Sequence, residues 1–179
     1  FWYKTDLFYT SADVHLKIAE TLEFETPVSP EKFTAKVIRH AVTSPDGKTL
    51  VFNALGYLWS KQLPNGKPKR ITKGIDFEFE PNYSPDGKTI VYVTWNDKEL
   101  GAIHSIPSKG GTSIKLSSEK GIFRTPSYSS DGLSIVYLKE SGNNEQGHSF
   151  AKNAGIYIMD ASGKNPYLLV DKGQYPMFT

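Results

Sequence analysis

The sequence predicts an all-β protein: a partial β-propeller of about three to four four-stranded antiparallel blades. A recurring turn motif carries this prediction. Ser-Pro-Asp-Gly-Lys-Thr stands at residues 44–49 and again at 84–89, and a shortened copy, Ser-Asp-Gly, stands at 130–132. The aspartates of these turns are 40 and then 45 residues apart. A period of about that length, built from short strands, is typical of propeller blades.

Each copy of the motif has the chemistry of a tight turn that leads into a strand. Proline fixes φ near −65° at the first corner, aspartate bonds to the backbone ahead of it, and glycine takes the positive φ that closes the turn. The serine before the proline can hold the turn through its hydroxyl group. The third copy lacks the proline and the lysine, and we expect the same turn there. The residues given this structural role are Asp46, Gly47, Asp86, Gly87, Asp131 and Gly132.

The pattern around these turns divides the chain into blades. We expect blades at 37–73, 74–121 and 122–173, with the outer strands of a preceding blade and a connection at 1–36, and the start of a further blade at 174–179. The expected strands of the three blades are 38–43, 49–52, 56–63, 69–72, 79–83, 89–94, 101–106, 113–116, 125–129, 134–139, 155–160 and 167–170. Two strands, 6–10 and 15–19, are expected before them.

Both ends of the chain resemble interruptions of the repeat, so we expect a fragment of a longer polypeptide. Fewer than four blades fall short of the 4–8 that close a typical propeller. Two copies of the chain are therefore expected to pair.

Composition and motifs exclude several classes of function. A formal net charge of +2 without a block of basic residues argues against nucleic-acid binding. The absence of cysteine excludes disulfides and thiolate chemistry. No apolar run reaches the ~20 residues of a membrane span. The four histidines have no metal-ligand spacing, and no catalytic motif is present, so we expect no catalytic residue, no metal and no cofactor in this segment.

The Ser-Pro-Asp-Gly-Lys-Thr repeat, with outer hairpins closing on Gly-Lys or Gly-Gly, resembles the WD-like repeat of TolB-type β-propellers over about residues 37–179. Residues 121–126 and 147–150 look most like the propeller that precedes bacterial amidohydrolase-type domains. The resemblance implies a non-catalytic segment that scaffolds or gates such a hydrolase domain. The alternatives are a TolB-type protein-interaction propeller of the bacterial cell envelope and the gating propeller of a prolyl-oligopeptidase-type peptidase. It also implies a periplasmic or envelope location, with the rest of the polypeptide and a protein or peptide ligand as partners.

Two groups of residues are candidates for binding. Counting back from the turn aspartates aligns the starts of the innermost strands, where Arg39, His40, Glu80 and Arg124 form a predicted channel mouth. The connections between second and third strands lengthen along the chain and supply Trp95, Asp97 and His148, the last within 140–154. Variable loops on a rigid scaffold commonly carry binding sites. The alternative is that strand ends and loops are polar simply because they face water.

Overall fold

The computed structural model describes residues 3–7, 20–24, 35–140 and 153–178. The chain divides into two compact units, 1–34 and 35–179. In the first unit, β1 (Tyr3–Leu7) pairs antiparallel with β2 (Glu20–Phe24). The strand expected at 6–10 thus begins within β1, the strand expected at 15–19 lies outside the described residues, and β2 was not anticipated.

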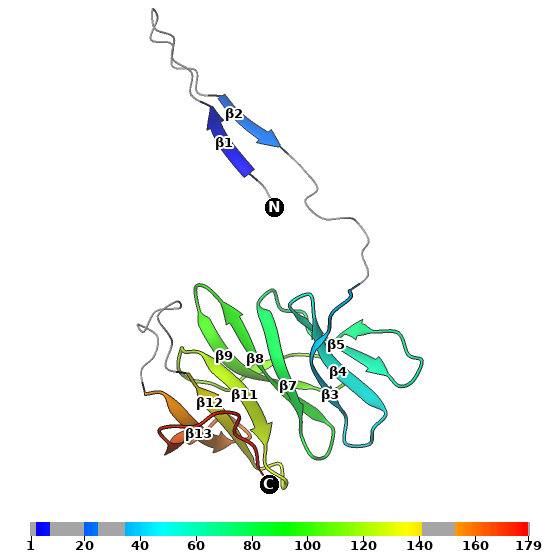
Figure 1. The fold of residues 1–179 in the computed structure, drawn as a ribbon, viewed down its shortest axis with the longest axis vertical. Helices are drawn as coiled ribbons and strands as arrows, with labels where there is room; N and C mark the ends of the chain where they lie inside the picture. The colour runs from blue at the N-terminus through cyan, green and yellow to red at the C-terminus, as the bar shows by residue number, and fades with distance from the viewer. Residues whose placement is uncertain (1–2, 8–19, 25–34, 141–152, 179) are drawn as a thin grey trace, which may run out of the picture. The chain divides into compact units, whose positions relative to one another are not determined.

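The second unit contains three four-stranded antiparallel sheets, which confirms the predicted partial β-propeller (Figure 1). The observed strand ends lie within two residues of the predicted ones. Blade 1 contains β3 (Arg39–Thr43), β4 (Thr49–Ala54), β5 (Tyr57–Gln62) and β6 (Lys69–Arg70). Blade 2 contains β7 (Phe77–Tyr83), β8 (Thr89–Asn96), β9 (Leu100–Pro107) and β10 (Ile114–Lys115). Blade 3 contains β11 (Phe123–Tyr128), β12 (Ser134–Lys139), β13 (Gly155–Asp160) and β14 (Tyr167–Val170).

The three turns have one hydrogen-bond pattern. The Ser44 hydroxyl donates to Asp46 Oδ1 at 2.6 Å and accepts from the Thr49 amide at 2.9 Å. In the shortened third copy, the Ser129 hydroxyl donates to Asp131 Oδ1 at 2.5 Å in the same way. The turn therefore depends on the serine and aspartate side chains rather than on proline.

The first strands of the blades, β3, β7 and β11, lie side by side (Figure 1), and each contains a β-bulge. The residue at each bulge has positive φ: His40 at 49°, Glu80 at 50° and Thr125 at 47°. Tyr175, which the repeat places in the same column, has φ 51°. Positive φ is uncommon outside glycine, and bulges of this kind often redirect side chains beside functional sites.

Apolar side chains fill the space between consecutive blades. The cluster between blades 1 and 2 contains Val51, Leu58, Ile71, Tyr83, Ile90, Tyr92 and Ile106. The cluster between blades 2 and 3 contains Val91, Val93, Ile103, Leu116, Phe123, Tyr128, Ile135, Tyr137 and Met159. The central strands of blade 2 therefore send alternate side chains to the two neighbouring blades, which explains the almost continuously apolar sequence of β8.

Glycines in the outer hairpins let each blade approach the preceding one closely. A Cβ on Gly110 (φ 87°) would lie 3.0 Å from the Ile71 carbonyl oxygen of blade 1. A Cβ on Gly163 (φ 83°) would lie 2.5 Å from the Leu116 carbonyl oxygen of blade 2. These turns need glycine both for their conformation and for the blade-to-blade contact.

Candidate functional site

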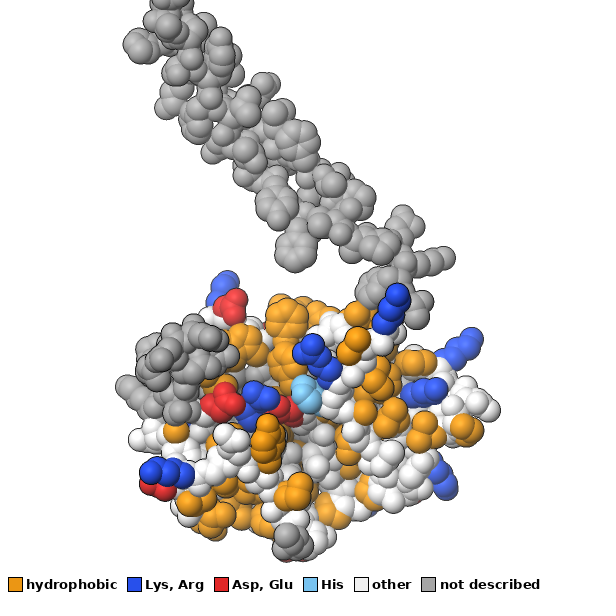
Figure 2. Space-filling view, viewed as in Figure 1, with side chains coloured by type: hydrophobic (Ala, Val, Ile, Leu, Met, Phe, Trp, Pro, Cys, Tyr) orange, Lys and Arg blue, Asp and Glu red, His pale blue; other side chains and the backbone are white. Residues whose placement is uncertain are grey.

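A cleft opens where the first strands of all three blades meet the end of β8. This first cleft has a volume of about 530 Å³. Its lining residues are Arg39, His40, Phe79, Glu80, Val93, Thr94, Trp95, Ile122, Phe123 and Arg124. Figure 2 shows charged side chains of both signs gathered around a histidine on this face, with hydrophobic side chains beside them. The volume is within the range of small-molecule pockets.

Glu80 links blades 2 and 3 from the base of this cleft. Its Oε1 accepts hydrogen bonds from Arg124 Nε at 2.7 Å and Nη2 at 2.5 Å. Its Oε2 accepts from the Thr125 amide at 2.5 Å. The Glu80 side chain is only 9% exposed, so its carboxylate is occupied within the protein and positions other groups.

The basic groups of the first cleft differ in how far they are neutralised. Hydrogen bonding to Glu80 raises the pKa of Arg124, which also pairs with Glu140 Oε1 at 3.3 Å. Burial lowers the pKa of His40, whose Nε2 lies 4.0 Å from Glu80 Oε1, and so favours the neutral imidazole. Arg39 is exposed and has no ion pair within the described part of the chain. Arg39 therefore carries the one positive charge of the first cleft that forms no ion pair among the described residues.

Aromatic side chains form the apolar wall of the first cleft. The half-buried Trp95 donates from Nε1 to Asp97 Oδ1 at 3.0 Å, which fixes the orientation of the indole. Phe79 meets His40 edge to face, with ring centroids 6.4 Å apart. Trp95 and Phe79 together give a rigid apolar surface beside Arg39.

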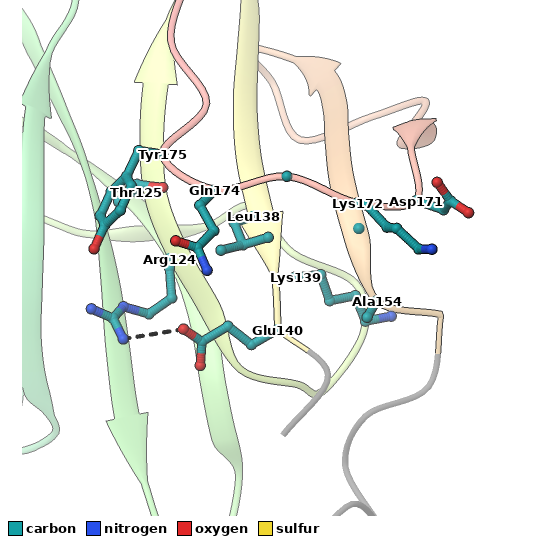
Figure 3. Close-up of a pocket in the computed structure, with 12 residues that line it drawn as sticks. Arg124, Thr125, Leu138, Lys139, Glu140, Ala154, Asp171, Lys172, Gln174 and Tyr175 are labelled. Atoms are coloured by element: carbon teal, nitrogen blue, oxygen red, sulfur yellow. Dashed lines mark hydrogen bonds and ion pairs between the residues drawn. The ribbon is translucent and has the colours of Figure 1, made fainter. Parts of the chain in front are cut away.

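A second cleft of about 490 Å³ lies at the equivalent position of the next blade. Phe79, Glu80 and Trp95 of the first cleft correspond, 45 residues later, to Arg124, Thr125 and Glu140 of the second. In Figure 3 the Arg124 side chain points toward Glu140, while Asp171 points away from both. Equivalent positions of the two blades thus hold aromatic side chains in the first cleft and charged side chains in the second.

The structure brings five predicted residues together at the first cleft: Arg39, His40, Glu80, Trp95 and Arg124. Asp97 contacts Trp95 from the adjoining loop. His148 lies outside the described residues. The sequence analysis missed Glu140 as the second partner of Arg124. Glu140 follows Trp95 by the same 45 residues that separate Asp86 and Asp131, so the repeat could have identified it.

His104 packs in a strand, with its ring centroid 5.7 Å from that of Tyr92. The residue equivalent to it in blade 3 is Tyr157, which pairs with Tyr137 as His104 pairs with Tyr92. His104 is the fourth residue of the predicted strand 101–106, and the fourth residue of the predicted strand 155–160 is Ile158, one position away from the observed equivalent. Within the described ranges no group of three or more His, Cys, Asp or Glu side chains is arranged to hold a metal ion.

Comparisons with known proteins agree with this architecture. TolB, a Tol-Pal system protein of Francisella tularensis subsp. mediasiatica, is 31% identical over 84 residues, which is 47% of this chain and 18% of that protein. TolB from Acinetobacter baumannii superposes on 78% of this chain and 33% of its own, with a TM-score of 0.62 and 19% identity. The chain has a TolB-like β-propeller fold.

Other solved structures share the fold of this TolB-like propeller. The nidogen/laminin complex covers 94% of this chain and 60% of its own, with a TM-score of 0.60 and 14% identity. Oligogalacturonate lyase in complex with manganese covers 72% of this chain and 39% of its own, with a TM-score of 0.59 and 14% identity.

No protein-family model matches the chain. The sequence match spans less than a fifth of the length of the curated relatives. In the described part of the structure, no helix has the length and apolar character to cross a membrane.

Proposed function

We propose that this TolB-like propeller is a non-catalytic protein-interaction segment, and that its first cleft binds an extended peptide of a protein partner. One observation carries the proposal: the rigid aromatic wall of Trp95 and Phe79 stands beside Arg39, whose charge no acid in the described residues neutralises. Tryptophan and arginine are the residue types most enriched at the energetic centres of protein interfaces. The cleft therefore suits a peptide with a carboxylate next to an apolar side chain.

The bacterial cell envelope, and its periplasm in particular, is the proposed location. The sequence match to a Tol-Pal system protein supports it. Scaffolding or gating of a hydrolase domain is the second candidate, because the tricorn protease contains blades of this fold (TM-score 0.53, 16% identity). An amidohydrolase-type domain in the same polypeptide is proposed only on the resemblance of residues 121–126 and 147–150.

A peptide-display selection on the immobilised chain tests the binding proposal. Enriched peptides are synthesised, and their dissociation constants are measured by fluorescence polarisation. Trp95→Ala should raise Kd at least about tenfold, the effect of losing one interface anchor. Arg39→Ala should raise Kd by about three- to tenfold, with the larger effect at low salt.

Lys88→Ala is the matched control, because Lys88 is 82% exposed and follows a Pro-Asp-Gly turn at the opposite ends of the strands. It should leave Kd unchanged. Failure to enrich any peptide, or binding that tolerates both cleft substitutions, would show that the first cleft is not a peptide site.

A further inference from the structure

A third cleft lies between blades 2 and 3, at the ends of the strands that carry the Asp-Gly turns and away from the first cleft. Its volume is about 470 Å³. The turn of blade 2 supplies Pro85 and Asp86, and the turn of blade 3 supplies Asp131. Apolar surface is added by Pro107 at the end of β9 and by Ile114 of β10, which is 62% exposed. Carboxylates therefore stand beside an apolar surface in this cleft.

A tyrosine hydroxyl group at the third cleft has no partner. Tyr128 is 9% exposed and lines this cleft, and its hydroxyl group forms no hydrogen bond with the described residues. Burial and the charge of Asp86 raise the pKa of Tyr128 to about 12, so the phenol stays protonated. At the equivalent place between blades 1 and 2, the Tyr83 hydroxyl group is fully buried. The Tyr128 hydroxyl group can instead accept a hydrogen bond from a ligand in the cleft.

The turn aspartates of the third cleft differ in their counterions. Lys88 Nζ lies 3.4 Å from Asp86 Oδ2. Leu133 replaces this lysine in the turn of blade 3, and Asp131 forms no ion pair among the described residues. Hydrogen bonds from the Ser129 hydroxyl group and the Leu133 amide to Oδ1 lower the pKa of Asp131. The third cleft therefore contains an ionised carboxylate without a counterion in the described part of the chain.

Lysines occupy two equivalent positions between blades 1 and 2. Lys69 of β6 stands where β10 has Ile114, because each pairs with a serine of the third strand of its blade. Lys88 stands where the third turn has Leu133. The chain thus supplies its own ammonium groups at the place between blades 1 and 2 that corresponds to the third cleft, whereas both positions are apolar between blades 2 and 3. A lysine of another molecule would restore the missing group.

We infer that the third cleft binds the lysine side chain of a protein partner. The ammonium group lies between the Asp131 carboxylate and the Tyr128 hydroxyl group, both of which accept its hydrogen bonds. The methylene chain lies on Ile114 and the neighbouring prolines, because lysine stems readily cover apolar surface while the charged end stays in a polar environment. This site is separate from the peptide site proposed at the first cleft, and neither proposal depends on the other.

Titration of the 179-residue chain with Nα-acetyl-L-lysine methylamide, followed by two-dimensional NMR of the backbone amides, tests the inference. We expect saturable shifts of the amides of residues 129–134, with a Kd on the order of 1 mM for so small a ligand. The Nε-acetylated analogue keeps the methylene chain and loses the charge. It should therefore bind about tenfold more weakly.

Substitutions in two turns identify the binding groups. Asp131→Asn keeps an oxygen for the turn but removes the charge, and should raise Kd about tenfold. Leu133→Lys restores the lysine of the other turns, which competes with the ligand, and should raise Kd by about the same factor. Tyr128→Phe should raise Kd about threefold, the effect of one hydrogen bond. Asp46→Asn is the matched control, because it makes the same change in the turn of blade 1 and should leave Kd unchanged.

The amide spectra also show whether each variant folds. Leu133→Lys supplies the test if Asp131→Asn does not fold, because Leu133 is 69% exposed and the other two turns have lysine at this position. Three results would overturn the inference: no saturable shifts up to about 20 mM ligand, equal binding of the Nε-acetylated analogue, or a Kd that responds alike to Asp131→Asn and Asp46→Asn.

Discussion

The interface between blades 1 and 2 and the interface between blades 2 and 3 bury different kinds of side chain at the same position of the repeat. At the same point of the repeat, blade 2 presents Glu78 to blade 1, and blade 3 presents Phe123 to blade 2; the two side chains are 2% and 5% exposed. They are 45 residues apart, as are the turn aspartates Asp86 and Asp131. A carboxylate and a phenyl ring therefore occupy equivalent buried positions.

Buried Glu78 is accommodated by polar groups of blade 1. Its Oε2 accepts from the Leu58 amide at 2.8 Å and from the Thr72 hydroxyl at 2.6 Å, and Arg70 Nη2 lies 4.0 Å from its Oε1. Burial nevertheless raises the pKa of Glu78, because desolvation outweighs these contacts. The carboxylate holds the edges of two blades in register.

The interface between blades 2 and 3 places its polar contacts elsewhere. Phe123 packs in the apolar cluster with its ring centroid 5.8 Å from that of Tyr137. Charged contacts between these blades are instead the Glu80–Arg124 pair at the first cleft and the pair between Lys139 of β12 and Glu119 of the connection after β10. The turns and bulges therefore determine where consecutive blades contact each other, while the side chain at an equivalent contact can be either charged or apolar.

The largest expected effect is that of Phe123→Ala. It removes a buried ring from the apolar interface and should lower the free energy of unfolding by about 3–5 kcal/mol. Urea denaturation followed by circular dichroism measures this value. A loss below about 1 kcal/mol would mean that the blade 2–3 interface does not depend on its apolar cluster.

Glu78 should respond to two substitutions differently. Glu78→Ala leaves the buried Leu58 amide without its acceptor and should cost about 2–3 kcal/mol. Glu78→Gln keeps an acceptor oxygen and should cost less than about 1 kcal/mol at pH 7. Equal losses for the two variants would show that the charge, rather than the acceptor, holds the interface.

The pH dependence gives an independent test of Glu78. Because its pKa is raised in the folded state, folding favours the protonated form, and its contribution to stability is lost as the pH rises from the unfolded-state value near 4.3 through the folded-state pKa. The wild-type chain should therefore lose stability over that window relative to Glu78→Gln. A constant difference between the two chains across this range would contradict the assignment.

Much of the blade architecture could be predicted from the sequence, because the Pro-Asp-Gly turns determine both the conformation and the spacing of the strands. The column of His40, Glu80, Thr125 and Tyr175 could also be aligned by counting. Its positive φ could not be predicted, since none of these residues is glycine and the bulge arises from strand pairing. Nor could Glu80 be recognised as internally paired, because its partners are 44 and 45 residues away. The residue types predicted a polar cleft. They could not show that Arg124 is paired with acidic side chains while Arg39 is not, because this difference depends on tertiary contacts.

The smallest expected effect is that of Glu80→Gln at the first cleft. Arg124 is 43% exposed, so solvent weakens its attraction to Glu80, and we expect a loss of about 1 kcal/mol or less that shrinks further in high salt. Glu99→Gln is the control, because the Glu99–Lys120 pair is exposed at both ends and should contribute almost nothing. Urea denaturation at low and high salt measures both. A loss for Glu80→Gln as large as that for Glu78→Ala would show that the Glu80–Arg124 pair, and not the apolar cluster, holds blades 2 and 3 together.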